Sequence, residues 1–152
     1  MDLEALSALV GKGLSLEEIA GQMDWKEFEG LVGQVFEENG WSVRRNVRFK
    51  TRSRFEIDLV AEKSFRALLV DCKHWGIRPG KKYQLKAAVE KQKIRVKEFK
   101  KIRSLADFPP NHPKKSPLLV TLWEEDILKV SGVWIVPLFK LNAFLLNAEK
   151  YI

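Results

Sequence analysis

The sequence predicts a mixed α/β domain in which a central sheet of about five strands is flanked by helices in the order α-β-β-β-α-β-β-α. Residues 55–61 and 67–73 are two apolar runs separated by a short polar gap, which is the pattern of paired strands. A long amphipathic pattern at 83–103 follows them, and another apolar run begins at 118. A strand, a helix and a further strand imply a crossover with some parallel pairing. Helices on both sides of the sheet complete an α/β domain.

Length and charge indicate one globular domain with a polyanionic partner. At 152 residues and 45% hydrophobic residues the chain can build a core, and no apolar run reaches the ~18–20 residues of a membrane span. The net charge of +7 favours a nucleic acid over a membrane surface and does not separate DNA from RNA, although a basic protein without such a partner has the same charge. The single cysteine and an acidic N-terminus unlike a signal peptide predict a cytoplasmic location.

The first 22 residues predict two short helices, which we assign to an N-terminal helical arm, and residues 23–152 form the main domain. Residues 13–20 have the character of a helix-turn-helix fragment, but without a recognition helix they are better interpreted as a packing arm. Asp24 then caps a strong helix that Gly40 ends. Trp25 and Phe28 open the apolar face of this helix, and Glu29 lies at its edge, where it leans over the sheet or stays in solvent.

A basic stretch follows, where residues 41–49 predict the first strand. Six cations and no acid occur between positions 44 and 54: Arg44, Arg45, Arg48, Lys50, Arg52 and Arg54. Uncompensated like charges repel, so a nucleic-acid phosphate nearby is favoured over a solvated edge, and residues 50–53 are expected to be a flexible hairpin tip. Arg45 shares the parity of the apolar side chains, which indicates a bulge or a snorkelling side chain. Beyond the third strand, Trp75, Lys81 and Lys82 could extend this surface by stacking and charge, although Trp75 could equally pack under its loop.

Ionisable residues interrupt the two apolar strands and indicate a site. Asp58 lies within the first run, and Asp71 and Lys73 end the second. A buried carboxylate is costly unless it is paired, hydrogen-bonded or bound to a metal. Asp71 and Lys73 share one face of their strand, and in a hairpin Asp58 can reach Asp71. Two adjacent carboxylates suit Mg²⁺ or Mn²⁺, with Lys73 as a fixed positive charge; a structural ion pair is the alternative.

The second half of the chain predicts the remaining elements. Gln92 falls in the apolar stripe of the helix at 83–103, so it needs hydrogen-bond partners and either contacts the site or pins the helix. A proline-rich loop at 104–117 precedes a strand at 118–123. An acidic turn at 124–126, or one helical turn through 129, leads to a last strand at 133–136 and a closing helix at 138–147.

This ordered set resembles the PD-(D/E)XK nuclease superfamily, which has the restriction-endonuclease-like fold. The similarity rests on a helix with Phe28-Glu29, a strand with Glu56-Ile57-Asp58, a strand ending in Asp71-Cys72-Lys73 and a long helix with Gln92. Within the superfamily the sequence is most similar to the archaeal Holliday-junction resolvases and the methyl-directed restriction endonucleases. The resemblance covers about residues 24–136, and it departs from the family pattern where Glu56 replaces a proline.

The resemblance implies a divalent-metal-dependent DNA endonuclease that hydrolyses phosphodiester bonds and is either structure-specific, for junctions, or of the restriction type. It implies that Asp58 and Asp71 bind Mg²⁺ or Mn²⁺, that Glu29 and the carbonyl of Cys72 complete the site, and that Lys73 orients water. Gln92 matches a glutamine that some branches carry. The alternative is a non-catalytic nucleic-acid-binding module, or a complex subunit, on the same fold. Enzymes that cut both strands are often twofold dimers, so a homodimer is a further expectation.

Overall fold

The structure is a computed structural model that describes residues 1–74, 81–102, 114–122 and 126–152, apart from the side chains at positions 16, 17, 20 and 81. Twelve elements lie in these ranges. In chain order they are α1 (Leu3–Gly11), α2 (Leu16–Gly21), α3 (Trp25–Glu38), β1 (Ser42–Lys50), β2 (Arg54–Lys63), β3 (Arg66–Lys73), α4 (Lys81–Phe99), β4 (Lys114–Thr121), β5 (Leu128–Val130), β6 (Val133–Pro137), α5 (Leu138–Leu146) and α6 (Ala148–Tyr151).

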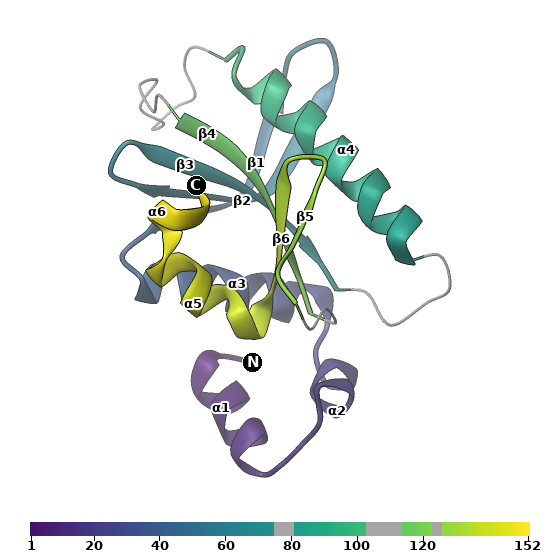
Figure 1. Ribbon diagram of the computed structural model, residues 1–152, viewed down its shortest axis with the longest axis vertical. Helices are drawn as coiled ribbons and strands as arrows, with labels where there is room; N and C mark the ends of the chain where they lie inside the picture. Colours follow the sequence, from purple (N-terminus) through teal and green to yellow (C-terminus); the bar gives the residue numbers. More distant parts are fainter. Residues whose placement is uncertain (75–80, 103–113, 123–125) are drawn as a thin grey trace.

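The strands form one mixed sheet in the order β1-β2-β3-β4-β6-β5 (Figure 1). Strands β1, β2 and β3 are antiparallel neighbours, whereas β3 and β4, and β4 and β6, run parallel. The mixed α/β sheet expected from the sequence is therefore confirmed, including the parallel pairing across the long helix.

The described sheet has six strands rather than about five, because β5 forms where a helical turn was expected. Strand β5 pairs antiparallel with β6. The two residues between them, Ser131 and Gly132, both have positive φ, at 49° and 81°. Two successive residues with positive φ make the tight turn that matches the twist of a hairpin, so the local Ser-Gly signal outweighs the acidic segment before it.

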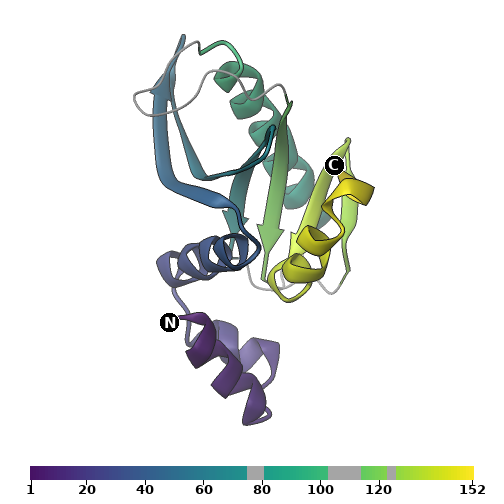
Figure 2. The same ribbon diagram turned by 90° about the vertical axis from the view of Figure 1, so that its left-hand side faces the viewer.

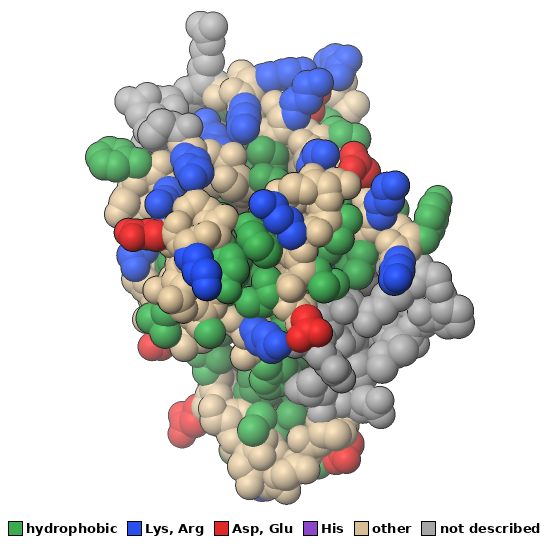
Figure 3. All heavy atoms as spheres, viewed as in Figure 1, with side chains coloured by type: hydrophobic (Ala, Val, Ile, Leu, Met, Phe, Trp, Pro, Cys, Tyr) green, Lys and Arg blue, Asp and Glu red, His purple; other side chains and the backbone are tan. Residues whose placement is uncertain are grey.

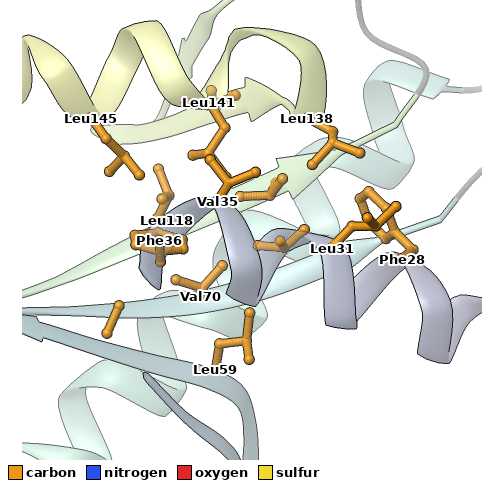
Figure 4. Packing of buried hydrophobic residues seen from close by; sticks show 14 of the residues in the cluster. Phe28, Leu31, Val35, Phe36, Leu59, Val70, Leu118, Leu138, Leu141 and Leu145 are labelled. Atoms are coloured by element: carbon orange, nitrogen blue, oxygen red, sulfur yellow. The ribbon is translucent and has the colours of Figure 1, made fainter. Parts of the chain in front are cut away.

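Helices cover both faces of the sheet (Figures 1 and 2). Helices α3 and α5 pack on one face, where Phe28, Leu31 and Phe36 of α3 meet Leu141 of α5 and the strand residue Val70 (Figure 4). Helix α4 covers the other face, where its apolar side chains join smaller clusters with β1, β2, β3, β4 and β6. In the described residues, no helix is both long enough and apolar enough to cross a membrane.

Helix α3 begins and ends where the sequence predicts. The Asp24 carboxylate accepts a hydrogen bond from the Glu27 backbone N–H at 2.8 Å, and Gly40 follows the helix with φ of +81°. Trp25 corrects one detail of the expected apolar face, because its side chain is 56% exposed. It is the first residue of the helix, one turn before Phe28 reaches the core.

Helices α1 and α2 lie together below α3 (Figures 1 and 2). Leu6 and Ile19 are buried in the same core as α3. The Leu3 backbone N–H also donates to Gln34 Oε1 at 2.9 Å, and the N-terminal amine contacts Glu27 at 2.9 Å. These contacts attach the segment to one helix of the main domain, and its assignment as an arm that ends at residue 22 stays a prediction.

Candidate active site

The candidate site lies where the sheet separates between β2 and β3. Their antiparallel ladder ends at the Leu59–Val70 pair, and the next pair in this register would be Asp58 and Asp71. Instead, Asp58 Oδ2 accepts a hydrogen bond from the Cys72 backbone N–H at 2.9 Å. A carboxylate therefore replaces a backbone carbonyl as the partner of β3, and it is held beside Asp71.

A local distortion of the hairpin accompanies this separation. The ladder between β1 and β2 keeps one register on both sides of Asn46 and Asp58 but omits that pair, and Asn46 has φ of +52°. Side-chain alternation also shifts there, because Ile57 packs with Val60 on the α4 side of the sheet although the two are three residues apart. An extended strand would put them on opposite faces, so the backbone turns at Asp58.

Two cations flank the buried carboxylate of Asp71. Lys73 Nζ lies 3.2 Å from Asp71 Oδ2, and Arg95 Nη1 of α4 lies 3.8 Å from Asp71 Oδ1. Asp71 is only 4% exposed, and its Oδ2 accepts no hydrogen bond of normal geometry from any described residue. A buried acceptor in this condition has capacity for a further ligand.

Glu29 of α3 is close enough to this pair for its protonation to depend on them. Burial and then the charge of Asp58 raise the pKa of Glu29 to about 7, with smaller contributions from Glu56 and Asp71. Burial and the neighbouring Asp71 together raise the pKa of Asp58 to about 6, against the lowering effect of the hydrogen bond from the Cys72 N–H. Acids that repel one another in this way favour a bound cation.

The atoms at this site that could bind a metal are carboxylate oxygens, which are the ligands that Mg²⁺ and Mn²⁺ prefer. Asp58 and Asp71 are adjacent, and Asp71 Oδ2 has the ionic contact with Lys73 but accepts no hydrogen bond of normal geometry from a described residue, so these two residues fit a hard divalent ion. Among the described residues, however, no three His, Cys, Asp or Glu side chains already converge on one metal position. Glu29 thus neighbours the pair without completing a preformed three-residue set.

Gln92 faces β3, and both polar atoms of its side chain form hydrogen bonds within the protein. Its side chain is fully buried, and its Nε2 donates to the Leu69 carbonyl at 2.7 Å. Its Oε1 accepts from Arg95 Nη1 at 3.0 Å. Of the two uses considered from the sequence, pinning the helix is therefore the one that these bonds support.

Two further residues complete the surroundings. Burial raises the pKa of the Cys72 thiol well above its ordinary value, with Asp58 and Asp71 adding to the effect, so a thiolate is disfavoured. The ring of His74 lies 5.9 Å from that of Phe28, and its buried Nε2 has no hydrogen-bond partner among the described residues.

The basic stretch at 44–54 was expected to have no counter-charges, and that expectation was wrong. Acids from other segments pair with four of its six cations, at nitrogen–oxygen distances of 3.3, 2.9, 3.6 and 3.2 Å: Arg44 with Glu62, Arg45 with Glu37, Arg48 with Glu56, and Arg52 with Glu98. Strand pairing and the flanking helices bring these acids from outside the stretch. The Arg45 side chain snorkels over Gly33 and the register stays continuous, so no bulge forms.

The remaining two cations, Lys50 and Arg54, lie directly opposite each other in the β1–β2 register. Both are exposed, and neither forms an ion pair with another described residue. Like charges in facing positions repel, which favours an anion beside them. Lys82 is also exposed, whereas Trp75 and the side chain of Lys81 lie outside the described residues. Lysine and arginine predominate on the upper part of the surface in Figure 3, where Figure 1 places α4 and the hairpin.

The hairpin tip is attached to α4, contrary to the flexible tip that the sequence suggested. Glu98 is 3% exposed, and its carboxylate accepts from Thr51 Oγ1 at 2.7 Å, Lys101 Nζ at 3.0 Å and Arg52 Nη2 at 3.2 Å. These bonds hold the pKa of Glu98 at about 2, below its ordinary value. The basic hairpin is therefore fixed to the helix that carries Gln92 and Arg95.

A separate cavity of about 610 Å³ lies between the β2–β3 turn and helices α5 and α6. Trp41, Phe65 and Leu146 are among the residues that line it, and none of the clustered acids does. It lies at the end of β3 opposite to Asp71, so it is separate from the acids at the strand separation.

Sequence reasoning missed Arg95 and Glu98 as members of these two clusters. Both lie in the helical pattern that the sequence identifies, but they are among many charged residues on that helix. A helical wheel would have placed Arg95 beside the apolar stripe, because it lies three residues after Gln92. Glu98 is next to Phe99 in sequence and therefore lies about 100° from it on the wheel, so the pattern gives no signal for its burial.

A model of the Mrr_cat family, described as "Restriction endonuclease", matches residues 20–106. An uncharacterized protein of Archaeoglobus fulgidus is 31% identical over 131 residues, which are 86% of this chain and 95% of that protein. The fold is also similar to a crystal structure of a protein of unknown function, with a TM-score of 0.46 and 19% identity over 78% of this chain and 63% of the other. From the match over 20–106, the chain belongs to the Mrr_cat restriction endonuclease family.

Proposed function

We propose that this protein is a divalent-metal-dependent DNA endonuclease that hydrolyses phosphodiester bonds at the strand separation between β2 and β3. The family already indicates a nuclease domain of the restriction-endonuclease type. The observation that carries the finer proposal is the position of Asp58, whose carboxylate is bonded to the Cys72 backbone N–H and sits beside the buried Asp71. Such a carboxylate pair is costly in a folded protein unless a cation joins it.

In this proposal Asp58 and Asp71 hold Mg²⁺ or Mn²⁺, with Glu29 and the Cys72 carbonyl as the additional ligands. Support comes from Asp71 Oδ2, which accepts no hydrogen bond of normal geometry from a described residue, and from the raised pKa values of Glu29 and Asp58, which a bound cation would lower. A divalent ion at this position supplies two things that phosphodiester hydrolysis needs, a more acidic water and neutralisation of charge on the phosphate.

Lys73 has a different task from the carboxylates. Its ammonium group is 3.2 Å from Asp71 Oδ2, which fixes its direction along the same face of β3. There it orients the attacking water or stabilises negative charge that develops on the phosphate oxygens. Gln92 contributes indirectly, by holding α4 against β3 through the Leu69 carbonyl.

DNA would reach the site along the surface of α4 and the β1–β2 hairpin. Lys50 and Arg54 provide charge that no described residue pairs with, and Lys82 adds charge at the start of α4. Arg44, Arg45, Arg48 and Arg52 would bind phosphate only in exchange for, or in addition to, their acidic partners. Cleavage of junctions and cleavage of the restriction type both remain within the proposal, and a twofold homodimer would suit either.

Cleavage assays test the proposal with linear duplex, supercoiled plasmid, four-way junction and single-stranded DNA, each with Mg²⁺, Mn²⁺ or EDTA. The expected result is metal-dependent cleavage of at least one substrate, lost in both Asp58→Asn and Asp71→Asn. Glu90→Gln is the matched control, because Glu90 is an exposed acid on α4 whose ion pair among the described residues is with Lys93, at 3.7 Å. Cleavage that persists in both aspartate variants would contradict the site.

The same proteins separate this function from a non-catalytic nucleic-acid-binding module. A binding module would retain DNA, release it as salt rises, and respond equally to Asp71→Asn and Glu90→Gln. An endonuclease loses cleavage in Asp71→Asn while its DNA affinity in EDTA stays the same or rises, because a negative charge has been removed from the site.

A further inference from the structure

Arg95 is a second cation on the Asp71 carboxylate, and it comes from a different element than Lys73. Its Nη1 lies 3.8 Å from Asp71 Oδ1, across the carboxylate from the Lys73 ammonium. This distance is too long for a hydrogen bond. A guanidinium whose role was only to neutralise a buried carboxylate would approach to about 2.8 Å, commonly with two parallel bonds.

Gln92 accounts for the position of Arg95. Its Oε1 accepts from Arg95 Nη1 at 3.0 Å, while its Nε2 donates to the Leu69 carbonyl of β3 at 2.7 Å. Gln92 is fully buried, so its amide is a rigid link from the backbone of β3 to the guanidinium. Arg95 is therefore fixed relative to the strand that carries Asp71 by a group other than Asp71 itself.

The rest of the guanidinium is available for a ligand. In the described part of the chain, Nε and Nη2 of Arg95 have no hydrogen-bond partner, and the side chain is 24% exposed. A planar fork with free N–H groups, held beside a solvent-accessible site, matches the two oxygens of a phosphate. Lysine at this position would offer only a point charge.

The charge of the site supports the same role. Three carboxylates, those of Glu29, Asp58 and Asp71, face two cations, those of Lys73 and Arg95. With a divalent ion bound and all three acids ionised, the total is one positive charge, which a single phosphodiester neutralises. Without Arg95 the total would be zero, and the site would lose this attraction for its substrate.

We propose that Arg95 binds a phosphate of the DNA substrate at the candidate site, and that Gln92 is the residue that positions it. This inference rests on the proposed nuclease function. It adds a substrate contact from α4 to the acids of β2 and β3, and it gives Gln92 a role through Arg95 in place of a direct one.

The test measures DNA affinity separately from cleavage. Fluorescence anisotropy with a labelled duplex is carried out in Ca²⁺, which occupies hard oxygen sites, and in EDTA, for Arg95→Ala, Arg95→Lys and the control Lys93→Ala. Lys93 is an exposed cation two residues away on the same helix, so it matches the change in net charge. Thermal melting and Mn²⁺ titration of each variant report on folding and on the carboxylates.

Arg95→Ala is expected to weaken DNA binding in Ca²⁺ by about tenfold or more, as for a lost charge-assisted hydrogen bond. Arg95→Lys should recover part of this loss, and Lys93→Ala should change affinity by about twofold at most. Mn²⁺ affinity should stay the same or increase in Arg95→Ala, because a positive charge next to the acids has been removed. If Arg95→Ala does not fold, the comparison of Arg95→Lys with Lys93→Ala decides the question.

Gln92→Met removes both hydrogen bonds of the link while it keeps the volume of the side chain. Its loss of DNA affinity should not add to that of Arg95→Ala in the double variant, because both changes act on one contact. A purely structural Gln92 would instead lower the melting temperature and leave the DNA affinity of the folded protein unchanged.

Equal DNA affinity for Arg95→Ala, Arg95→Lys and Lys93→Ala, in a protein that cleaves DNA in a manner dependent on Asp58, would overturn this inference and leave the proposed function intact. Absence of both DNA binding and cleavage in the unchanged protein would overturn the two together.

Discussion

Glu98 of α4 and the acids at the strand separation, Asp58, Asp71 and Glu29, have surroundings that are opposite in character. Glu98 accepts bonds from a hydroxyl and two cations, and its pKa is held at about 2. At the strand separation, burial and mutual repulsion raise the pKa of Asp58 to about 6 and that of Glu29 to about 7. The acids are at least partly buried in both places. Among the described residues, Glu98 receives hydrogen bonds from three side chains, whereas Asp58 receives one from the Cys72 N–H.

The difference separates a structural acid from acids for which we propose a ligand. Glu98 stabilises the fold because its charge is satisfied by groups of the chain, and these bonds fix the hairpin tip to α4. Asp58 and Glu29 are unfavourable as charges in the absence of a cation, which is typical of functional sites. Burial of an acid alone would not distinguish the two cases; the sign of its pKa shift does.

The largest effect should come from Asp58→Asn. We expect cleavage to fall on the order of a hundredfold or more, as when one charge-stabilising group is removed from an active site. The melting temperature at pH 8 should stay the same or rise, because a repelled, partly buried charge has been removed. Initial cleavage rates and thermal melting measure the two effects, and a large fall in melting temperature would place Asp58 with Glu98 as a structural acid.

The second prediction concerns Glu98→Gln, for which the reverse pattern is expected. The variant should melt at a lower temperature, since the charge that binds Arg52 and Lys101 is lost, while the acids of the site are unchanged. Glu90→Gln, an exposed acid of the same helix, should melt close to the unchanged protein. Glu98 has a lowered pKa, so its contribution is present above its ordinary value of 4.5 and disappears as the pH falls towards about 2. A melting temperature for Glu98→Gln equal to that of Glu90→Gln would contradict the structural assignment.

A third, smaller effect is the pH dependence of metal-free stability. Glu29 and Asp58 have raised pKa values, so the folded state holds their protons more tightly than the unfolded state. As the pH rises from the ordinary values of 4.5 and 3.8 to about 7 and 6, these two groups should therefore lower the stability. Differential scanning calorimetry in EDTA measures this decline, and Glu29→Gln with Asp58→Asn should flatten it.

Added divalent metal should change the melting temperature by an amount that depends on pH. Mg²⁺ should raise the melting temperature more at pH 8 than at pH 5, because protons compete with the ion for Glu29 and Asp58. An equal increase at both pH values, or an increase retained in Asp58→Asn, would show that the ion binds elsewhere.

The smallest effect should distinguish cations that have internal partners from those that do not. Lys50→Ala and Arg54→Ala should each weaken DNA binding by several-fold and reduce the dependence of affinity on salt, since their charges face each other and pair with no acid in the part of the chain that the structure describes. Arg45→Ala should have less effect, because its guanidinium contacts Glu37 at 2.9 Å. Anisotropy titrations at several salt concentrations compare the three variants, and a larger loss for Arg45→Ala would reverse this ranking.

The sequence predicted the elements that have strong local signals. Asp24 and Gly40 delimit α3, and the apolar periods of β2, β3 and α4 lead directly to the mixed sheet. The short β5 was missed because its formation depends on pairing with β6, and a three-residue strand carries little signal of its own.

At the site, the placement of Asp58 beside Asp71 could be anticipated from strand alternation and a hairpin, and their metal-binding and catalytic roles stay predictions. The strand separation could not be anticipated, because it depends on the conformation of Asn46 and on a side-chain-to-backbone bond across two strands. The partners of the basic stretch were missed for a related reason. Glu37 lies on α3 and Glu98 on α4, whereas their arginine partners belong to the β1–β2 hairpin. Only the folded chain brings these charges together.

The left-handed backbone at Asn46 has a consequence for engineering this protein. A β-branched residue there would oppose positive φ and favour ordinary pairing of β1 with β2, and a stability-driven redesign of the hairpin would select that change. The more regular sheet would then direct the Asp58 carboxylate away from its place beside β3. Engineering for higher thermal stability should therefore keep Asn46 unchanged, because the backbone conformation that such a change would remove is the one that accompanies the position of Asp58.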